Sequence, residues 1–452
     1  MTPISPELIL EILRCVGDCR DTFSVCCLVC RTWRALAQPF LFSQIQLSLE
    51  SDCAPWNQKF SKYPHLADFV IILDLWGHGW RQSPPFVVLD PFLEGPATLE
   101  LICWLSNVKS LLISDIYSLS KLELDALCHF TRVEHLEMHG VSFRRPEDLL
   151  HFMSHVVGLR SLNVSDTTID SEGSHKSIAS LLHDHVDSVS RRLRSLEVES
   201  AANHLYMLSW LSGRTFDTSD LTELTFLWKC LPTNIGLTAP QLSSSVDMFL
   251  SVVGAGIKYL NLGIEMRWQH FSKPKKVNPM LDHFIATAAL KRFTALETLN
   301  IQSPHSLIPN EASRLDDIER LLHCVTFPNL WRMHLMIGFI FYTPDDFRSY
   351  KDLPVWANLN GLLSSPHFPS LRQVDFIVET ESPYWHALKS EDTLRSIGLE
   401  GGGDGPILGR QWTWPDNPPT FQDIVGMIKT KMPTLVSHGR LEFRNNSNHR
   451  FW

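Results

Sequence analysis

Several features that mark membrane and secreted proteins are missing from the sequence. No apolar run approaches the ~18 residues of a membrane span, and the most apolar stretch, Leu330 to Tyr342, is broken by Arg332 and His334. The start of the chain has no charged-then-apolar leader, because Glu7 and Glu11 interrupt its apolar positions. We therefore expect no membrane contact and a location in the cytoplasm, the nucleus or both.

Motifs of catalysis and of metal or cofactor binding are also missing. The sequence contains no Gly-x-Ser-x-Gly, no His-Glu-x-x-His and no Walker loop. Five of the ten cysteines fall between Cys15 and Cys30, but no Cys-x-x-Cys pair is followed by a second pair at zinc-finger spacing. We expect these thiols to be reduced and to act as small apolar residues. The sequence therefore predicts a non-catalytic chain with no cofactor and no metal.

The balance of residue types predicts a folded protein whose main partner is not a nucleic acid. Apolar residues make up 44% of the chain and charged residues 20%, as in folded globular proteins. The net charge of −9 argues against binding to a phosphate backbone. With 452 residues, the chain is long enough for a large core or a stacked array of repeats.

The first 48 residues predict three short helices. Ser5 can cap the first helix, Pro6 is tolerated at its first position, and Gly17 can end it. A second helix follows, and a third is expected to end at Pro39. Apolar residues recur at helical spacing over more than one face of the first helix, at Leu8, Ile9, Ile12, Leu13 and Val16.

The same segment has an Ile-Ser-Pro start at residues 4–6 and a Val-Cys-Arg-x-Trp run at residues 29–33. In this order and spacing it resembles an F-box, the helical module that binds a Skp-type adaptor and, through it, a cullin. The serine is a departure, because in the family the proline directly follows the first apolar residue. The resemblance leaves open whether Val29 and Trp33 face the adaptor or the module's interior. It implies an adaptor-binding set of Ile4, Pro6, Leu8, Ile12, Val29, Cys30, Arg31 and Trp33.

A degenerate pattern fills most of the remaining chain: an apolar residue, two others, an apolar residue, one other, and a third apolar residue. It occurs ten times, with starts separated by 25 residues (Val108 to Val133) to 41 residues (Leu330 to Leu371). The last two apolar positions fall on one side of a short strand. Helical patterns lie between the strands, among them 178–189 and 246–253. The ten triplets are Val70/Leu73/Leu75, Val108/Leu111/Ile113, Val133/Leu136/Met138, Leu159/Leu162/Val164, Leu193/Leu196/Val198, Leu221/Leu224/Phe226, Ile257/Leu260/Leu262, Leu296/Leu299/Ile301, Leu330/Met333/Leu335 and Leu371/Val374/Phe376.

Strand, turn and helix in repetition resemble the leucine-rich-like repeats that follow the F-box in many fungal F-box proteins. The alternative is a run of unrelated strand–helix units in one doubly wound sheet. We predict an α/β fold with an F-box at 1–48, an irregular leucine-rich-repeat solenoid at 49–380, and a C-terminal cap and irregular tail at 381–452. Within that tail we expect a helix at Phe421–Ile428 and a strand at Leu441–Phe443.

In a solenoid strand, the residues beside the last two apolar positions point to the open face of the sheet. Acidic residues predominate there over a single Arg332. If they lie on adjacent strands, their charges are about 5 Å apart, and they form either solvated surface or a recognition surface for a Lys/Arg-bearing protein segment. The candidate substrate-binding residues are Asp74, Glu137, Glu197, Glu199, Glu223 and Asp375.

Together the two resemblances imply the substrate-recognition subunit of an SCF-type (Skp adaptor, cullin, F-box) ubiquitin ligase. Such a subunit has no catalytic residue and acts by bringing a protein substrate close to the transferring enzyme. The alternative is a non-catalytic leucine-rich interaction scaffold that binds a Skp-type adaptor without ubiquitin transfer.

Overall fold

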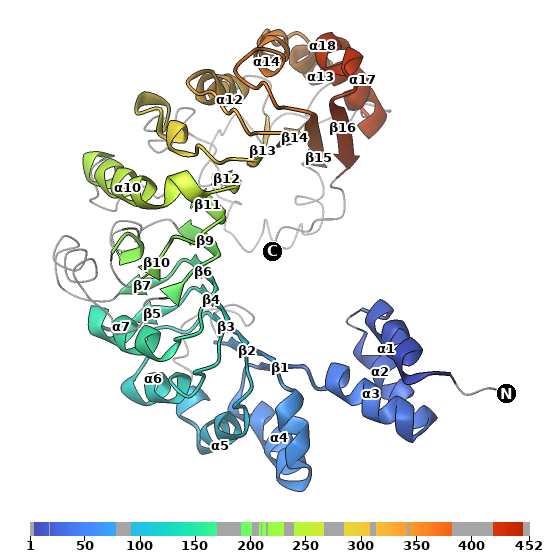
Figure 1. Cartoon of the computed structure of the whole chain (residues 1–452), viewed down its shortest axis with the longest axis vertical. Coiled ribbons are helices and arrows are strands. Elements are labelled where there is room, and N and C mark those ends of the chain that lie inside the picture. Colours follow the sequence, from blue (N-terminus) through green and yellow to red (C-terminus); the bar gives the residue numbers. More distant parts are fainter. Residues whose placement is uncertain are drawn as a thin grey trace, which may run out of the picture. The chain divides into compact units, whose positions relative to one another are not determined.

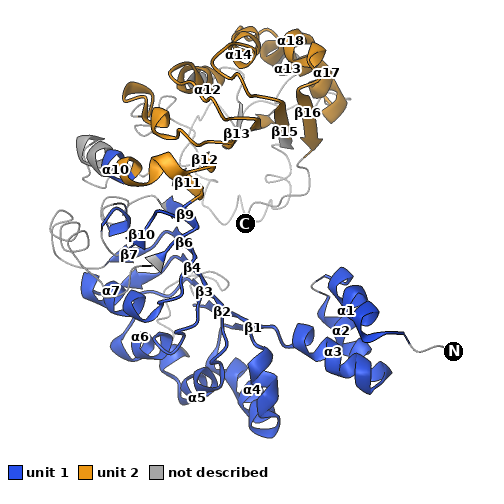
Figure 2. Cartoon of the chain, viewed as in Figure 1, with its two compact units in different colours: residues 1–221, 244–249 blue, residues 222–243, 250–452 orange. Residues whose placement is uncertain are grey.

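The computed structural model describes residues 4–17, 19–77, 92–169, 191–200, 208, 210–213, 216–229, 239–265, 284–307, 313–340, 344–381 and 419–445. The chain divides into two compact units, residues 1–221 with 244–249 and residues 222–243 with 250–452 (Figure 2). Each unit contains parallel strands connected through helices (Figure 1). Among the described residues, every helix is too short or too polar to cross a membrane.

The first unit begins with three short helices, α1 (Pro6–Cys15), α2 (Arg20–Val29) and α3 (Arg31–Leu41). The Ser5 side chain caps α1 by accepting a hydrogen bond from the Leu8 N–H at 3.4 Å. Gly17 follows the helix in the left-handed region, with φ at 68°, where glycine is favoured. The predicted start and end of the first helix are therefore confirmed.

The third helix continues past its proline. Pro39 lies inside α3, so the prediction that it ends this helix is wrong. Proline lacks only its own N–H, and the ladder closes beyond it because the Phe42 N–H donates to the Gln38 carbonyl at 3.0 Å. The helix ends two residues after the proline.

The three helices share a small core. Phe23 from α2 stacks on Phe40 from α3, with ring centroids 5.3 Å apart. Two of the five clustered cysteines pack against this core as predicted, whereas Cys15, Cys19 and Cys30 are exposed. The buried side chains are Ile9, Leu13, Phe23 and Ala37, with Val16, Cys26, Cys27, Trp33, Leu36, Phe40 and Leu41 packed against them.

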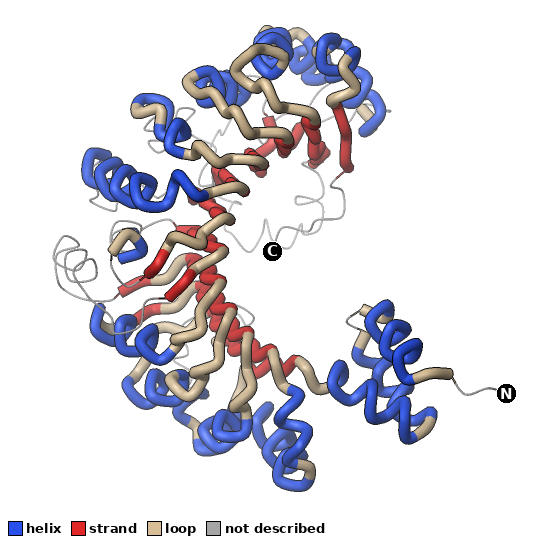
Figure 3. Tube along the Cα trace, in the orientation of Figure 1, coloured by secondary structure: helices blue, strands red, loops and turns tan. Residues whose placement is uncertain are grey.

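The repeats of the first unit place their strands side by side in chain order, all parallel: β1 (Gln44–Leu47), β2 (Ile72–Trp76), β3 (Ser110–Ser114), β4 (His135–His139), β6 (Ser161–Ser165) and β9 (Ser195–Ser200). Helices lie on one side of these strands (Figure 3). They are α4 (Glu50–Lys62), η1 (Pro64–Phe69), η2 (Phe92–Glu94), α5 (Pro96–Trp104), α6 (Lys121–Leu127) and α7 (Pro146–His155). Two short parallel pairs join the connections, β5 (Ser142–Phe143) with β7 (Thr168–Ile169) and β8 (Arg191–Arg192) with β10 (Phe216–Asp217).

The second unit repeats this arrangement. Its parallel strands, again in chain order, are β11 (Glu223–Lys229), β12 (Tyr259–Glu265), β13 (Thr298–Leu307), β14 (Arg332–Ile340), β15 (Gln373–Glu381) and β16 (Leu441–Asn445). Its helical segments are η3 (Gly254–Gly256), η4 (Ala289–Arg292), α12 (Ser313–His323), α13 (Pro344–Lys351), α14 (Val355–Leu363), α17 (Phe421–Lys431) and α18 (Pro433–Ser437). The residues of α10 (Ala239–Val253) are divided between the two units.

The strand order decides between the two predicted architectures. A doubly wound sheet reverses its order at a switch point, whereas within each unit the strands follow the chain without reversal. Every residue of the ten triplets is less than a tenth exposed, so the pattern marks the buried side of the repeats as predicted. The structure is that of a solenoid-like α/β repeat protein.

The backbone enters successive strands of the first unit in the same way. The N–H groups of Ile71 and Ile72 both donate to the Ser43 carbonyl, at 2.8 and 2.9 Å. The same arrangement occurs at four further carbonyls. Each accepts hydrogen bonds from two consecutive N–H groups at the start of the next strand, and the four carbonyls belong to Ile71, Lys109, Glu134 and Arg160. The entry point is thus fixed by backbone hydrogen bonds, and the segment between strands is free to vary in length.

The predicted C-terminal elements are confirmed, because α17 and β16 contain the expected helix and strand. The predicted helix at 178–189 and the part of the tail between 382 and 418 lie outside the described residues. The boundaries at residues 48 and 380 stay predictions.

We expect Leu13→Ala to loosen the three N-terminal helices, because Leu13 is fully buried and truncating a buried leucine costs about 2–5 kcal/mol. Amide hydrogen exchange over residues 6–41 is the appropriate measurement, since a chain of this size does not unfold in one step. Leu8→Ala is the matched control on the same helix, where the side chain is 55% exposed. Equal loss of protection in the two variants would contradict the described packing.

Candidate functional site

Two faces of the N-terminal helices expose apolar side chains. At the start of the segment these are Ile4, Leu8 and Ile12, which are 50, 55 and 41% exposed at intervals of four residues. On α2 they are Val25, Leu28 and Val29, which are 63, 77 and 60% exposed at helical spacing. Contiguous exposed apolar surface on soluble proteins marks partner-binding sites. These six residues, called here the apolar faces, form the first candidate site.

The predicted adaptor-binding residues occupy two different environments. Trp33 packs against the core of the three helices, whereas Val29 is exposed, so of these two residues only Trp33 belongs to the module's interior. Cys30 is the single extended residue between α2 and α3, with φ at −163° and ψ at 176°. The exposed members of the set are Ile4, Pro6, Leu8, Ile12, Val29, Cys30 and Arg31.

Two members of the apolar faces were missed by sequence reasoning. Val25 precedes Leu28 by three residues and Val29 by four, so it is a surface neighbour of both on α2. Their spacing relative to Val29 was the available signal. It was not decisive, because Phe23, which is also apolar and on the same helix, faces the core.

The second candidate site is the open strand face of the first unit. Side chains alternate along each strand, so Leu136 and Met138 are buried while Glu137 between them points to the other face. The register places Asp74, Leu112, Glu137, Asn163 and Glu197 side by side on β2, β3, β4, β6 and β9.

This register corrects the predicted spacing of the acidic residues. Asn163 on β6 stands between Glu137 and Glu197, so the two carboxylates lie two strand spacings apart, about 10 Å rather than 5 Å. Glu199 lies two residues further along β9, next to Ser165. The chain therefore separates like charges that the sequence placed on neighbouring strands.

Two of the acidic side chains on this strand face, Asp74 and Glu137, accept hydrogen bonds from neighbouring side chains of the same unit. Burial raises the pKa of Asp74 and the charge of Glu137 adds to it, although the Gln44 Nε2 donates to its Oδ2 at 2.7 Å. The hydrogen bond from His139, with Nε2 3.4 Å from Oε2, holds the pKa of Glu137 below its usual value. Both carboxylates thus have a polar partner within the chain.

The surroundings of Glu197 disfavour the ionised form of its side chain. Burial raises its pKa, and the negative charges of Glu199 and Glu137 raise it further. Glu199 accepts a hydrogen bond from the Ser165 hydroxyl at 3.0 Å. A nearby cationic group would stabilise the ionised form of Glu197.

The two predicted residues in the second unit behave differently from the others. Glu223 is exposed at the start of β11, in register with Tyr259. Asp375 on β15 has no exposed side-chain surface: its Oδ2 lies 2.9 Å from Arg332 Nε and 3.0 Å from His334 Nδ1. Asp375 was predicted as a substrate-binding residue, and its carboxylate is enclosed by these partners within the second unit.

The Asp375 cluster is a buried network of hydrogen bonds. Burial alone would raise the pKa of Asp375, but hydrogen bonds from Gln373 and Arg332 and the charges of His334 and Arg332 keep it below its usual value. Burial lowers the pKa of His334, and the positive charges of Arg332 and Arg444 add to this against the attraction of Asp375. The Asp375 carboxylate is thus stabilised by three side chains, those of Gln373, Arg332 and His334.

We expect Asp375→Ala to destabilise the second unit by about 3 kcal/mol, because Arg332 loses its buried partner. Hydrogen exchange of the β14 and β15 amides measures this. Glu442→Ala is the control, since Glu442 is exposed on β16 in register with Asp375 and should change stability by less than about 0.5 kcal/mol.

The pH dependence of this contribution follows from the lowered pKa of Asp375. Its stabilisation is complete above the unfolded value of about 3.9 and is lost as the pH falls through the lower folded value. A variant as stable as the unaltered chain at pH 7 would contradict the network.

Comparisons with known proteins find similar chains among the solved structures. No family model matches the chain, and no curated protein matches it. A chain of the crystal structure of the Rad7 and Elc1 complex in yeast is similar with a TM-score of 0.33 and 13% sequence identity, over 83% of this chain and 88% of that chain.

Proposed function

We propose that this chain is the substrate-recognition subunit of an SCF-type ubiquitin ligase. Helices α1–α3 bind a Skp-type adaptor, and through it a cullin, while the repeats bind a protein substrate. The observation that carries the proposal is the exposure of the apolar faces on α1 and α2. The chain itself contributes no catalytic residue and accelerates transfer by proximity alone.

The energetics of the three helices support an adaptor partner. Their core holds four buried side chains, and modules of about 40 residues usually depend on a partner for stability. Leu28 is 77% exposed and Leu8 55%, and fully burying a leucine contributes about 1.5–3 kcal/mol. An adaptor groove that covers both faces would thus stabilise the module and the complex together.

The inward position of Trp33 gives the aromatic residue a supporting role. It packs against the core of the helices, and its helix, α3, is preceded directly by Cys30, the extended residue that separates it from α2. Under the proposal, Trp33 holds α2 and α3 in place while Val29 contacts the adaptor.

We expect the double variant Leu8→Asp with Leu28→Asp to weaken binding of a purified Skp-type adaptor at least about tenfold, because two central apolar anchors become charged. The matched control is Leu122→Asp on α6, where the leucine is 58% exposed in the repeat region. A titration measured by calorimetry or surface plasmon resonance compares the three chains.

Unchanged adaptor affinity in the double variant, with intact helices by circular dichroism, would contradict the proposed surface. A reconstituted complex with adaptor, cullin and ring subunit separates the receptor from a scaffold. Ubiquitin transfer to a captured protein supports the receptor, and adaptor binding without any transfer supports the scaffold.

Substrate capture is expected to depend on the acidic strand face of the first unit. Glu137→Lys with Glu197→Lys should slow association of a Lys/Arg-bearing substrate more than it speeds dissociation, since complementary charge on a binding face acts mainly on the rate of encounter. Added salt should weaken capture, because charges are screened over about 8 Å at physiological ionic strength. The Leu8/Leu28 double variant is a suitable bait, since proteins that it retains are independent of the adaptor.

The control reverses two exposed acids away from the strand face, Asp68→Lys with Asp220→Lys. This variant has the same net charge as the test variant, so it isolates position from charge. If both variants weaken substrate capture equally, the substrate does not bind at the acidic row. The same conclusion follows if capture changes neither with salt nor with charge reversal.

A further inference from the structure

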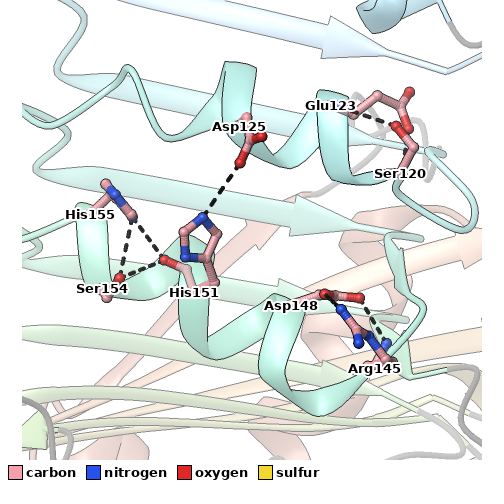
Figure 4. Close-up of polar contacts among 8 residues, drawn as sticks. All are labelled: Ser120, Glu123, Asp125, Arg145, Asp148, His151, Ser154 and His155. Carbon is pink, nitrogen blue, oxygen red and sulfur yellow. Dashed lines mark hydrogen bonds and ion pairs between the residues drawn. The ribbon is translucent and has the colours of Figure 1, made fainter.

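Helices α6 and α7 of the first unit bring together a set of metal-ligating side chains that no part of the proposed function uses. His151 and His155 lie one turn apart on α7, with ring centroids 4.8 Å apart. Asp125 on α6 points toward His151 across the gap between the helices (Figure 4). Cys128 follows Asp125 by three residues and is buried at the end of α6.

Three of these ligand atoms lie slightly farther apart than a bound zinc ion would hold them. A ring nitrogen of each histidine and the Cys128 sulfur all lie within 4.8 Å of one another. His151 Nε2 is 3.6 Å from Asp125 Oδ1. Tetrahedral zinc, with bonds of about 2.0–2.3 Å, holds its ligand atoms about 3.5 Å apart. The His151–Asp125 pair already has this spacing, and the ligand atoms of Cys128, His151 and His155 need to close by about 1 Å.

The hydrogen bonds of His155 prepare it as a ligand. Its Nδ1 lies 2.9 Å from the His151 carbonyl oxygen, which can only accept. Nδ1 therefore carries the ring proton, and Nε2 presents a lone pair. Ser154 adds a second contact to the same Nδ1 at 3.2 Å. Metal-bound histidines commonly donate their other ring N–H to a backbone carbonyl, which fixes both tautomer and orientation.

We propose that Asp125, Cys128, His151 and His155 bind a zinc ion that fastens α6 to α7. One sulfur, two imidazoles and one carboxylate favour zinc over magnesium or calcium, which prefer oxygen ligands. Four protein ligands close the coordination sphere, as in structural sites. The two helices flank β4 in the chain, so the ion would connect consecutive repeats of the first unit.

The state of the cysteine shows what zinc must displace. Burial, with a further contribution from the charge of Asp125, raises the pKa of the Cys128 thiol to about 11. Without a cation the sulfur keeps its proton at neutral pH, and zinc binding breaks the S–H bond, releases that proton to solvent and forms the Zn–S bond. His151 and Asp125 are about half exposed, which leaves the ion a path from solvent.

Cobalt substitution of the full chain tests the site directly. Chelator-treated protein titrated with Co²⁺ should show a thiolate-to-cobalt charge-transfer band and the intense visible bands of a tetrahedral ion. Cys128→Ser should abolish the charge-transfer band, and His151→Gln should lower zinc affinity at least about tenfold. The matched control is Cys103→Ser, an exposed cysteine on α5 of the same unit, which should keep both spectrum and affinity.

Thermal unfolding distinguishes a lost ligand from a lost fold. Without metal, His151→Gln and the unaltered chain should melt together, because His151 is half exposed, and only the unaltered chain should gain melting temperature on zinc addition. The proposal is overturned if the chelated chain binds no Co²⁺ or Zn²⁺. It is also overturned if Cys128→Ser and His151→Gln both bind as the unaltered chain does.

Discussion

The repeats depend on one constraint: each strand–helix unit must bury three apolar side chains that it cannot bury alone. Parallel pairing brings neighbouring triplets together, and all ten are less than a tenth exposed. The carbonyl that accepts two consecutive N–H groups sets where each strand of the first unit enters. With entry and burial fixed, the intervening segment can vary from repeat to repeat, which is why the period is irregular. Alternate strand positions take no part in the packing of the triplets, and some of them, such as Glu137 and Glu223, are partly or fully exposed.

The three N-terminal helices also have apolar side chains to bury, but they leave some of them exposed. Their small core accommodates only part of their apolar residues, so the remainder, among them Leu8 and Leu28, face solvent. Only two residues, Phe42 and Ser43, separate α3 from β1. The Arg20 guanidinium also donates to the Gln44 carbonyl at 3.4 Å, which ties α2 to the first strand. Under the proposed function, an adaptor surface and a substrate surface are thereby joined through a short connection.

The spacing of the triplets and the helix-capping residues made much of the fold predictable from the sequence. Contacts between side chains of different repeats could not be predicted in this way. The triplet spacing identified the buried strand positions, and Ser5, Pro6 and Gly17 marked the first helix. The orientation of Trp33 and Val29 could not follow from a helix pattern that is apolar on more than one face. The sequence predicted an exposed Asp375 because its partners, Arg332 and His334, come from the preceding repeat. The Cys128, His151 and His155 cluster was missed for the same reason, since only the packing of α6 on α7 unites it.

A hydrogen-exchange footprint of a Skp-type adaptor on the full chain tests whether the apolar faces of α1 and α2 bind that adaptor. We expect slowed exchange within residues 6–41 when adaptor is added, because burial of Leu8 and Leu28 also covers and steadies the backbone that carries them. The repeat strands should exchange as before. Protection confined to the repeats, or no change anywhere at saturating adaptor, would contradict the account.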